Sequence, residues 1–593
     1  MKIIVTIKQV PNIASLKFDT EKKTLVREGI PLEVSSYDLR ALIKAVDLVK
    51  EQGGEVVALT MGPPQAEQAL RQCLALGADR GIHLCDPAFA GSDTLATARA
   101  LSAAIWKEEC DLVFAGRCSV DAETGQVGPQ IAEVLDLPQV TGTRTIEIKE
   151  GIATLERETD DGFETVRAPL PLLVTAAEDF AEERFPRKKD REAAKEKTIE
   201  TLTPGDIGSE PSQFGATGSP TWVKDIVVRE QKRRCQYLPI EKLVPKLLDK
   251  GLFSAWEEDA TIVQSSRKRL EGEFLVVAEL ADGEVRSVTG ELLQEASRFT
   301  DNVSVLLIGH NTQEHRLYLS ARGARKIYVA DAPQLAEYGT EKYSEILKRV
   351  IQETAPTAVL LPSTSQGRDW APRVAGRLQL GLTGDCVGLD LDEKGQLLQY
   401  KPAFGGNVVA PIVSNTMPQM ATVRPGILAP APVRKARPAE ILEVSLDNLP
   451  EERVERISFR KEDEGEAARI ETADIVVGFG MGIGDPEKLQ QVRDFAAMLD
   501  APLVTTRDCT DAGWISKLHQ VGLTGRSISP KLYFAIGIQG AFEHTVGIQR
   551  SSTIVAINKD PQAWMWESAD YGLEGDWEEI LPKLSETLQA AKG

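Results

Sequence analysis

The sequence predicts an α/β protein with two duplicated parallel-sheet domains of a nucleotide-binding type and a third α/β domain. Short runs of β-branched residues alternate with amphipathic segments along most of the chain, as is typical of parallel sheets covered by helices. The pattern of the first region recurs roughly 245 residues later, which indicates duplicated domains rather than a solenoid. The length of 593 residues suits three or four domains of about 150 residues each.

The first predicted domain covers residues 1–185. Strands are predicted at 3–7, 55–60, 81–84 and 111–115, and segments with helical spacing start near residues 38, 65, 93 and 125. This alternation predicts a parallel sheet with helices on both faces.

Residues 186–273 are expected to be a linker and connecting segment. The polar run 182–219 ends in a stretch rich in glycine, serine and proline, a composition typical of linkers. Within it, residues 182–197 mix charges of both signs with few apolar residues, which favours a solvated tether.

The next predicted domain, residues 274–440, repeats the order of the first. The triplet Leu76-Gly77-Ala78 precedes the strand predicted at 81–84, and Arg322-Gly323-Ala324 precedes a strand predicted at 326–329. Residues 472–593 then form a third α/β unit, which begins with a predicted strand at 474–477.

The composition excludes several classes of protein. With 69 basic and 89 acidic side chains the net charge is −20, so nucleic-acid phosphates and anionic membrane surfaces would be repelled. The seven cysteines contain no C-x-x-C pair, and the five histidines have no metal-ligand spacing. No signal peptide and no long apolar segment are visible, so we expect a cytoplasmic protein without membrane insertion.

A glycine-rich turn opens the third unit. Residues 478–484 follow the pattern G-x-G-x-G between a strand and a helix, where glycines let backbone amides approach a pyrophosphate. The spacing differs from the G-x-G-x-x-G fingerprint of NAD-binding proteins. A tight strand-to-helix connection is therefore at least as well supported as a phosphate cradle.

Three further strand ends in the third unit carry small and polar residues, at 520–525, 537–544 and 555–561. Open parallel sheets bind ligands at the carboxyl ends of their strands, so these segments together predict a nucleotide pocket. His544 is then either a satisfied core histidine or a ligand contact. Arg507 is equally either a surface ion-pair partner or a ligand contact.

In the first domain, the loop 116–129 also joins a strand to a helix. Thr124 and Gln126 either cap that helix or hydrogen-bond a nucleotide. The equivalent loop of the second domain, 362–368, lacks the acidic residues of the first, so we expect the duplicated sheets to have diverged in ligand use.

Several long motifs follow one another in the order of a known family. They are Ala75 to Arg80 and Asp121 to Pro129, then Lys401 to Asn407 and Thr422 to Gly426, and finally Thr506-Arg507, Gln520 to Gly525, Gly537 to Ala541, His544, Ala556 to Asp560 and Ala569 to Gly572. In order and spacing they resemble electron-transfer flavoproteins over nearly the whole chain. The resemblance implies that the beta and alpha subunits are fused in one chain, beta first, that these halves pair with each other, and that residues 472–593 form an FAD-binding domain.

The resemblance also implies two sets of cofactor-binding residues. For FAD they are Thr506, Arg507, Val521, Gly522, Thr524, Gln539, Gly540, Ala541, Phe542, Glu543, His544, Asn558, Asp576 and Trp577. For a second nucleotide, either AMP or FAD, they are Thr6, Ser35, Ser36, Tyr37, Asp38, Met61, Asp121, Thr124, Gly125, Gln126 and Val127. Within the first set, Arg507 and His544 are expected to tune the flavin potential.

The function implied by the resemblance is electron transport. The leading hypothesis is an electron carrier that takes electrons on FAD from a flavin dehydrogenase of the acyl-CoA dehydrogenase type and passes them to a membrane quinone oxidoreductase. The alternative is an electron-bifurcating flavoprotein that oxidises NADH at a second FAD. In the resembling family the beta subunit docks the dehydrogenase through an apolar anchor followed by basic residues, for which Phe185 and the cluster at 187–189 are the candidates in this chain.

Overall fold

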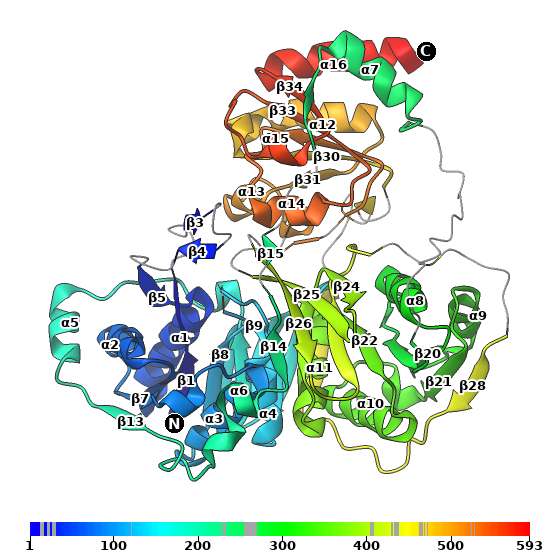
Figure 1. The fold of residues 1–593 in the computed structure, drawn as a ribbon. Helices are drawn as coiled ribbons and strands as arrows, with labels where there is room; N and C mark the ends of the chain where they lie inside the picture. Colours follow the sequence, from blue (N-terminus) through cyan, green and yellow to red (C-terminus); the bar gives the residue numbers. More distant parts are fainter. Residues whose placement is uncertain are drawn as a thin grey trace.

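The computed structural model contains three α/β units; in Figure 1 the first and second lie side by side and the third lies above them. We call them the first unit (residues 1–218), the second unit (270–461) and the third unit (473–592). The described residues are 1–11, 17–19, 24–26, 31–119, 121–225, 227–228, 233–253, 270–403, 408–428, 431, 438–461, 467, 469–470, 473–522, 525–526 and 528–592. Among them, no helix combines the length and the apolar character that a bilayer span requires.

The first unit is built on a ten-stranded sheet. Its order is β13 (Ile199–Leu202), β7 (Arg80–Leu84), β6 (Glu55–Met61), β1 (Lys2–Ile7), β8 (Leu112–Gly116), β12 (Leu172–Ala176), β9 (Gln139–Lys149), β10 (Ile152–Glu158), β11 (Gly162–Pro169) and β29 (Glu455–Lys461). The strands from β13 to β9 are parallel, and those from β9 to β29 are antiparallel.

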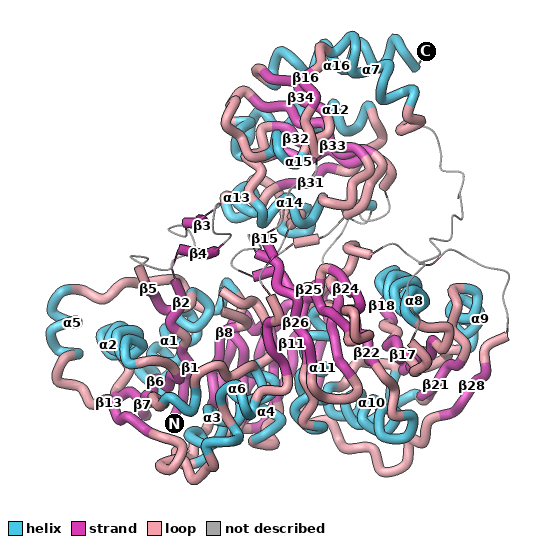
Figure 2. Tube along the Cα trace, in the orientation of Figure 1, coloured by secondary structure: helices cyan, strands magenta, loops and turns pink. Residues whose placement is uncertain are grey.

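Helices cover both faces of this sheet, as the alternation predicted. They are α1 (Ser36–Gln52), α2 (Glu67–Leu76), α3 (Thr94–Trp106) and α4 (Val127–Val134). Successive strand side chains point to opposite faces, so Ile3 and Val5 pack with α1 and α2 while Ile4 packs with α3 and α4. Figure 2 shows the strands of this unit as an inner layer between helices.

The second unit repeats the topology of the first. Its order is β28 (Glu440–Glu443), β21 (Lys326–Asp331), β20 (Val303–Gly309), β17 (Phe274–Val277), β22 (Ala358–Pro362), β27 (Gln419–Val423) and β23 (Leu382–Cys386), all parallel. Its helices are α8 (Ser287–Phe299), α9 (Gln313–Ala321), α10 (Thr340–Thr354) and α11 (Ser365–Leu378). Strand for strand this is the order from β13 to β9, which confirms the predicted duplication and makes α11 the counterpart of α4.

The two duplicated units exchange strands. β29 is the last strand of the second unit in sequence, but it pairs with β11 of the first. Reciprocally, β14 (Thr221–Val223) follows the first unit and joins the antiparallel strands β24 (Gly388–Leu391), β25 (Leu397–Ala403) and β26 (Val408–Ser414) of the second. The two halves of the chain therefore share both antiparallel layers, in agreement with the expected pairing of halves.

The segment 186–273, expected to be a linker, contributes elements to all three units. α5 (Lys188–Ala194) packs its buried Ala194 into the first core, so the tether interpretation is wrong for these residues. Farther along, β16 (Gln236–Tyr237) joins the third sheet, and α7 (Ile240–Asp249) adds apolar side chains to the third core. A polar composition concealed these elements because each is short and only one face of it is buried.

The third unit is a parallel sheet in the order β16, β34 (Tyr571–Glu574), β33 (Thr553–Asn558), β32 (Leu532–Ile536), β30 (Ile475–Phe479) and β31 (Leu503–Thr505). Its helices are α12 (Leu489–Met498), α13 (Arg507–Asp511), α14 (Phe542–Ile548), α15 (Met565–Ser568) and α16 (Trp577–Lys592). In Figure 1, α13 and α14 lie on the side that faces the other two units.

The remaining elements are short. They are β2 (Gln9–Pro11), β3 (Lys17–Asp19), β4 (Thr24–Val26), β5 (Leu32–Val34), β15 (Val227–Val228), β18 (Leu280–Ala281), β19 (Glu284–Val285) and α6 (Gly215–Gly218).

Candidate nucleotide-binding sites

A cavity of about 520 Å³ lies at the carboxyl edge of the third sheet, where all three units meet. The third unit contributes the residues that follow four adjacent strands, at 480–482, 506–508, 537–541 and 558–560. The other walls are Tyr37, Arg117, Cys118 and Glu123 of the first unit and Arg368 and Asp385 of the second. This is the edge at which parallel α/β sheets bind ligands.

Most of the residues predicted for FAD line this cavity. They are Thr506, Arg507, Val521, Gly522, Gln539, Gly540, Ala541, Glu543, His544 and Asn558. Thr524 lies outside the described residues, and Phe542 is the first residue of α14. Asp576 and Trp577 are not at the cavity: the carboxylate of Asp576 accepts a hydrogen bond from the Glu578 amide, and Trp577 is buried in the apolar core.

The glycine turn after β30 serves as a tight connection and also as a cavity wall. The Gly482 amide donates to the Gly537 carbonyl at 2.9 Å, and a Cβ on Gly482 would lie 2.5 Å from that same oxygen. Glycine is therefore required by the close approach of the two loops. Both loops also line the cavity, so the two interpretations of this motif are compatible.

His544 is both a buried histidine with satisfied hydrogen bonds and a residue of the cavity wall, the two alternatives that the sequence left open. It is only 4% exposed, its Nδ1 lies 2.9 Å from the Val521 carbonyl and its Nε2 lies 2.9 Å from the Tyr533 hydroxyl. A carbonyl only accepts, so Nδ1 carries the proton and Tyr533 donates to Nε2. Burial lowers the pKa of His544 to about 4, and the ring is therefore neutral at pH 7.

Arg507 likewise combines an ion pair with a place in the cavity wall. Its guanidinium pairs with Glu178 of the first unit and, at 3.1 Å, with Asp511 one helical turn away. The side chain is 41% exposed. Arg507 thus links the third unit to the first at the edge of the cavity.

A second cavity, of about 580 Å³, lies at the carboxyl edge of the first sheet. Of the residues predicted for the second nucleotide, Thr6, Asp38, Met61, Thr124, Gly125, Gln126 and Val127 line it. Ser35, Ser36 and Tyr37 do not, and Tyr37 instead lines the cavity of the third sheet. Asp121 is outside the lining as well, and its carboxylate pairs at 2.8 Å with Lys8, which does line the cavity.

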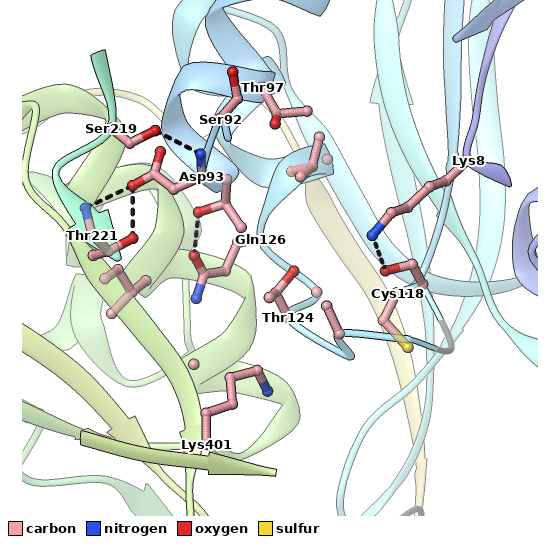
Figure 3. Close-up of a pocket in the computed structure, with 18 of the residues that line it drawn as sticks. Lys8, Ser92, Asp93, Thr97, Cys118, Thr124, Gln126, Ser219, Thr221 and Lys401 are labelled. Atoms are coloured by element: carbon pink, nitrogen blue, oxygen red, sulfur yellow. Dashed lines mark hydrogen bonds between the residues drawn. The ribbon is translucent and has the colours of Figure 1, made fainter. Parts of the chain in front are cut away.

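Some residues of this second cavity were missed by sequence reasoning. Ser92, Asp93, Thr94 and Thr97 at the start of α3 are among them (Figure 3), and the Asp93 cap before a helix was a usable signal. Thr383 and Lys401 come from the second unit, so no local pattern places them here. Asp93 also accepts from the Thr221 amide at 2.9 Å, which ties the exchanged strand β14 to the cavity.

Two polar atoms in the wall of this cavity have no hydrogen-bond partner among the residues that the structure describes. They are the amide nitrogen of Gln126 and the hydroxyl of Thr383, and both side chains are buried. Buried polar groups are nearly always paired in folded proteins. These atoms, from different units, therefore fit a polar ligand in the cavity.

The two cavities share a wall. Arg117 and Cys118, which follow β8, line both of them. Burial raises the pKa of the Cys118 thiol to about 11, so this cysteine is a neutral part of the wall at pH 7.

Comparison with known proteins agrees with this geometry. Residues 22–207 and 274–449 match the sequence profile of the electron transfer flavoprotein domain, and residues 469–549 match that of the electron transfer flavoprotein FAD-binding domain. The C-terminal part of the chain is similar to electron transfer flavoprotein subunit alpha of Thermoanaerobacterium thermosaccharolyticum, 42% identical over 323 residues that cover 54% of this chain and 98% of the relative.

Two other relatives extend the comparison. The N-terminal part is similar to electron transfer flavoprotein subunit beta of the same organism, 45% identical over 224 residues that cover 38% of this chain and 86% of the relative. The subunit LctC of the lactate dehydrogenase (NAD(+),ferredoxin) of Acetobacterium woodii is 35% identical over 351 residues, which cover 58% of this chain and 82% of the relative.

Proposed function

The chain belongs to the electron transfer flavoprotein family as a fusion of beta-like and alpha-like halves, and we propose that it carries electrons between two redox partners. It takes electrons on FAD from a flavin dehydrogenase of the acyl-CoA dehydrogenase type and passes them to a membrane quinone oxidoreductase. FAD occupies the cavity of the third sheet, and an adenine nucleotide occupies the cavity of the first. The observation that carries this proposal is the convergence of four strand ends and three units on one cavity.

The residues that line the cavity of the third sheet fit a flavin dinucleotide. FAD supplies electron transfer in one- and two-electron steps. The glycine loops at 480–482 and 537–540 allow close approach of the backbone, and the guanidiniums of Arg117, Arg368 and Arg507 provide positive charge. The first and second units complete the walls of the cavity, with Arg117 from the first and Arg368 from the second.

A specific observation favours the bifurcating alternative. The cavity of the first sheet, at about 580 Å³, is no smaller than the FAD cavity, at about 520 Å³. The loop Gln126 to Pro129 that borders it resembles the bifurcating version of this motif. A second FAD that oxidises NADH is therefore the alternative to AMP.

Acid release and chromatography of the nucleotides bound to the purified chain test both candidates. One FAD and one AMP per chain would support the carrier and exclude the bifurcating protein. Two FAD per chain, together with flavin reduction by NADH, would support bifurcation. A colourless protein that FAD does not reconstitute would contradict the whole proposal.

Replacing Arg507 with alanine is expected to lower the first one-electron potential of the flavin. A guanidinium about 4 Å away is worth about 4 kcal/mol at an effective dielectric constant of about 20, or roughly 170 mV for one electron. Glu178, Asp511 and water all act against this charge, so we expect a decrease of several tens of millivolts in a potentiometric titration.

Arg507→Lys is the matched control, because it keeps the charge while changing its shape. It should retain most of the wild-type potential. An alanine variant with the wild-type potential would reduce Arg507 to an ion-pair partner of Glu178 and Asp511.

Phe185 is the residue proposed to anchor the electron donor. Its side chain is 73% exposed and lies just before α5, where Lys188 and Lys189 follow. An exposed aromatic ring beside basic residues suits an acidic partner with an apolar pocket. Phe185→Ala should slow reduction by the donor dehydrogenase, measured by stopped-flow kinetics, and leave the FAD content unchanged.

The control for this prediction is Trp106→Ala, since Trp106 is similarly exposed but lies at the end of α3. Unchanged transfer in the Phe185 variant, or equal slowing in both variants, would rule out a specific role for Phe185.

A further inference from the structure

Lys401 belongs to the second unit but lies at the cavity of the first. It is in β25, its side chain is only 6% exposed, and Figure 3 shows it among the residues that line this cavity. The ammonium donates to the Glu123 carbonyl at 3.3 Å. Burial removes the ammonium from water, which costs free energy. One hydrogen bond of this length to a neutral carbonyl offsets only part of that cost.

The other lysine and arginine side chains that line this cavity are paired with carboxylates. Lys8 pairs with Asp121 at 2.8 Å, and Arg117 pairs with Glu158 at 3.3 Å. Burial lowers the pKa of Lys401, whereas Asp385 and Glu123 oppose that effect. Asp385 itself is held by Arg368 and Arg424, so it does not neutralise Lys401 directly.

The start of α4 lines the same cavity as Lys401 and is open to an acceptor. Gln126, the residue before the helix, makes no side-chain capping bond to the backbone. Within the described part of the chain, its amide nitrogen is one of the unpartnered buried atoms in the cavity wall, and the Thr383 hydroxyl is another. Helix starts have free amide donors and attract negative charge.

The duplicated unit shows what the equivalent helix start contacts. At α11, the counterpart of α4, the Ser365 amide donates to the Asp160 carboxylate at 2.8 Å and the Ser365 hydroxyl donates to it at 3.2 Å. Asp160 lies between β10 and β11 and thus comes from the opposite unit. The second unit therefore receives an anion at this position from the chain itself. In the described part of the first unit, no carboxylate bonds to the start of α4, and the buried ammonium of Lys401 lines the same cavity.

We propose that Lys401 binds the phosphate of the second nucleotide, together with the Gln126 amide and the start of α4. This assignment rests on the proposal that the first cavity holds an adenine nucleotide. Because Lys401 comes from the second unit, the phosphate is held between the two halves of the chain. The nucleotide then also stabilises their association.

The test compares AMP with adenosine on the full-length chain freed of nucleotide, by isothermal titration calorimetry. Lys401→Gln should weaken AMP about ten- to a hundredfold, the range of a charged hydrogen bond, and leave adenosine unchanged. Lys401→Arg keeps the charge and should lose less of the affinity for AMP than Lys401→Gln. The FAD content of the third unit, whose cavity does not include Lys401, reports whether the variants are folded.

The outcomes separate this assignment from the function on which it rests. A wild-type chain that binds neither AMP nor adenosine would contradict the nucleotide site itself. AMP binding that is equally strong in the wild type and Lys401→Gln would overturn the role of Lys401 alone. If Lys401→Gln loses FAD or its fold, the affinities of the wild-type chain for AMP and adenosine test the assignment instead. AMP must then bind at least tenfold more tightly than adenosine, and equal affinities would overturn the assignment.

Discussion

Replacing Arg373 with alanine is expected to loosen the contact between the two halves of the chain strongly. Arg373 lies in α11, is only 1% exposed, and donates to Glu133 and to the Leu137 carbonyl of the first unit, both at 3.0 Å. Removing one partner of a buried ion pair costs about 3–5 kcal/mol. Amides of α4 and α11 should then exchange hydrogen roughly a hundredfold faster or more.

Hydrogen exchange is the suitable measurement, because a chain of three units does not have one two-state unfolding free energy. Arg377→Ala is the matched control. Arg377 also pairs with Glu133, at 2.7 Å, but its side chain is 23% exposed, so its loss should cost less than about 1 kcal/mol. Equal exchange in the two variants would show that Arg373 contributes no more than a surface pair.

The parallel strands of the first two units, and the duplication of these units, were predictable because both follow from local patterns. Alternating runs indicated parallel strands with helices between them, and the repeat of short motifs such as Leu76-Gly77-Ala78 indicated the second copy. The exchange of β14 and β29 was not predictable in this way. Both strands carry exposed residues, and the partner of each is determined by packing between units rather than by its own sequence.

The same distinction applies to the candidate sites: local sequence predicts the position of some residues, and packing between distant segments determines that of others. Residues in continuous motifs, such as Gln539 to Ala541, lie at a strand end and line a cavity, where the sequence predicted a pocket. Trp577 was assigned to FAD through the family resemblance, but the residue starts an amphipathic helix and its ring fills the core. Lys401 was recognised as part of a family motif, yet its place at the cavity of the opposite unit depends on how two distant segments meet.

Replacing Gly522 with alanine is expected to remove most of the FAD from the purified chain. Gly522 has φ +145°, a conformation rare for any other residue, and an added Cβ would lie 2.1 Å from the Glu543 carbonyl oxygen. That oxygen belongs to the backbone of α14, so it cannot move without displacing the helix. Val521, Gly522, Glu543 and His544 all line the FAD cavity, and the clash therefore changes its shape.

The expected result is a purified Gly522→Ala chain with less than about a tenth of the wild-type flavin, since displacing a packed backbone costs several kcal/mol. Gly513→Ala separates the clash from backbone strain, because Gly513 also has a positive φ, of +73°, but a Cβ there meets nothing within 4 Å. It should keep its FAD. Flavin absorbance per chain, with circular dichroism to verify the fold, measures both. A Gly522→Ala chain with full FAD content would show that α14 and the segment at Val521 move apart without cost, and that the cavity does not depend on their contact.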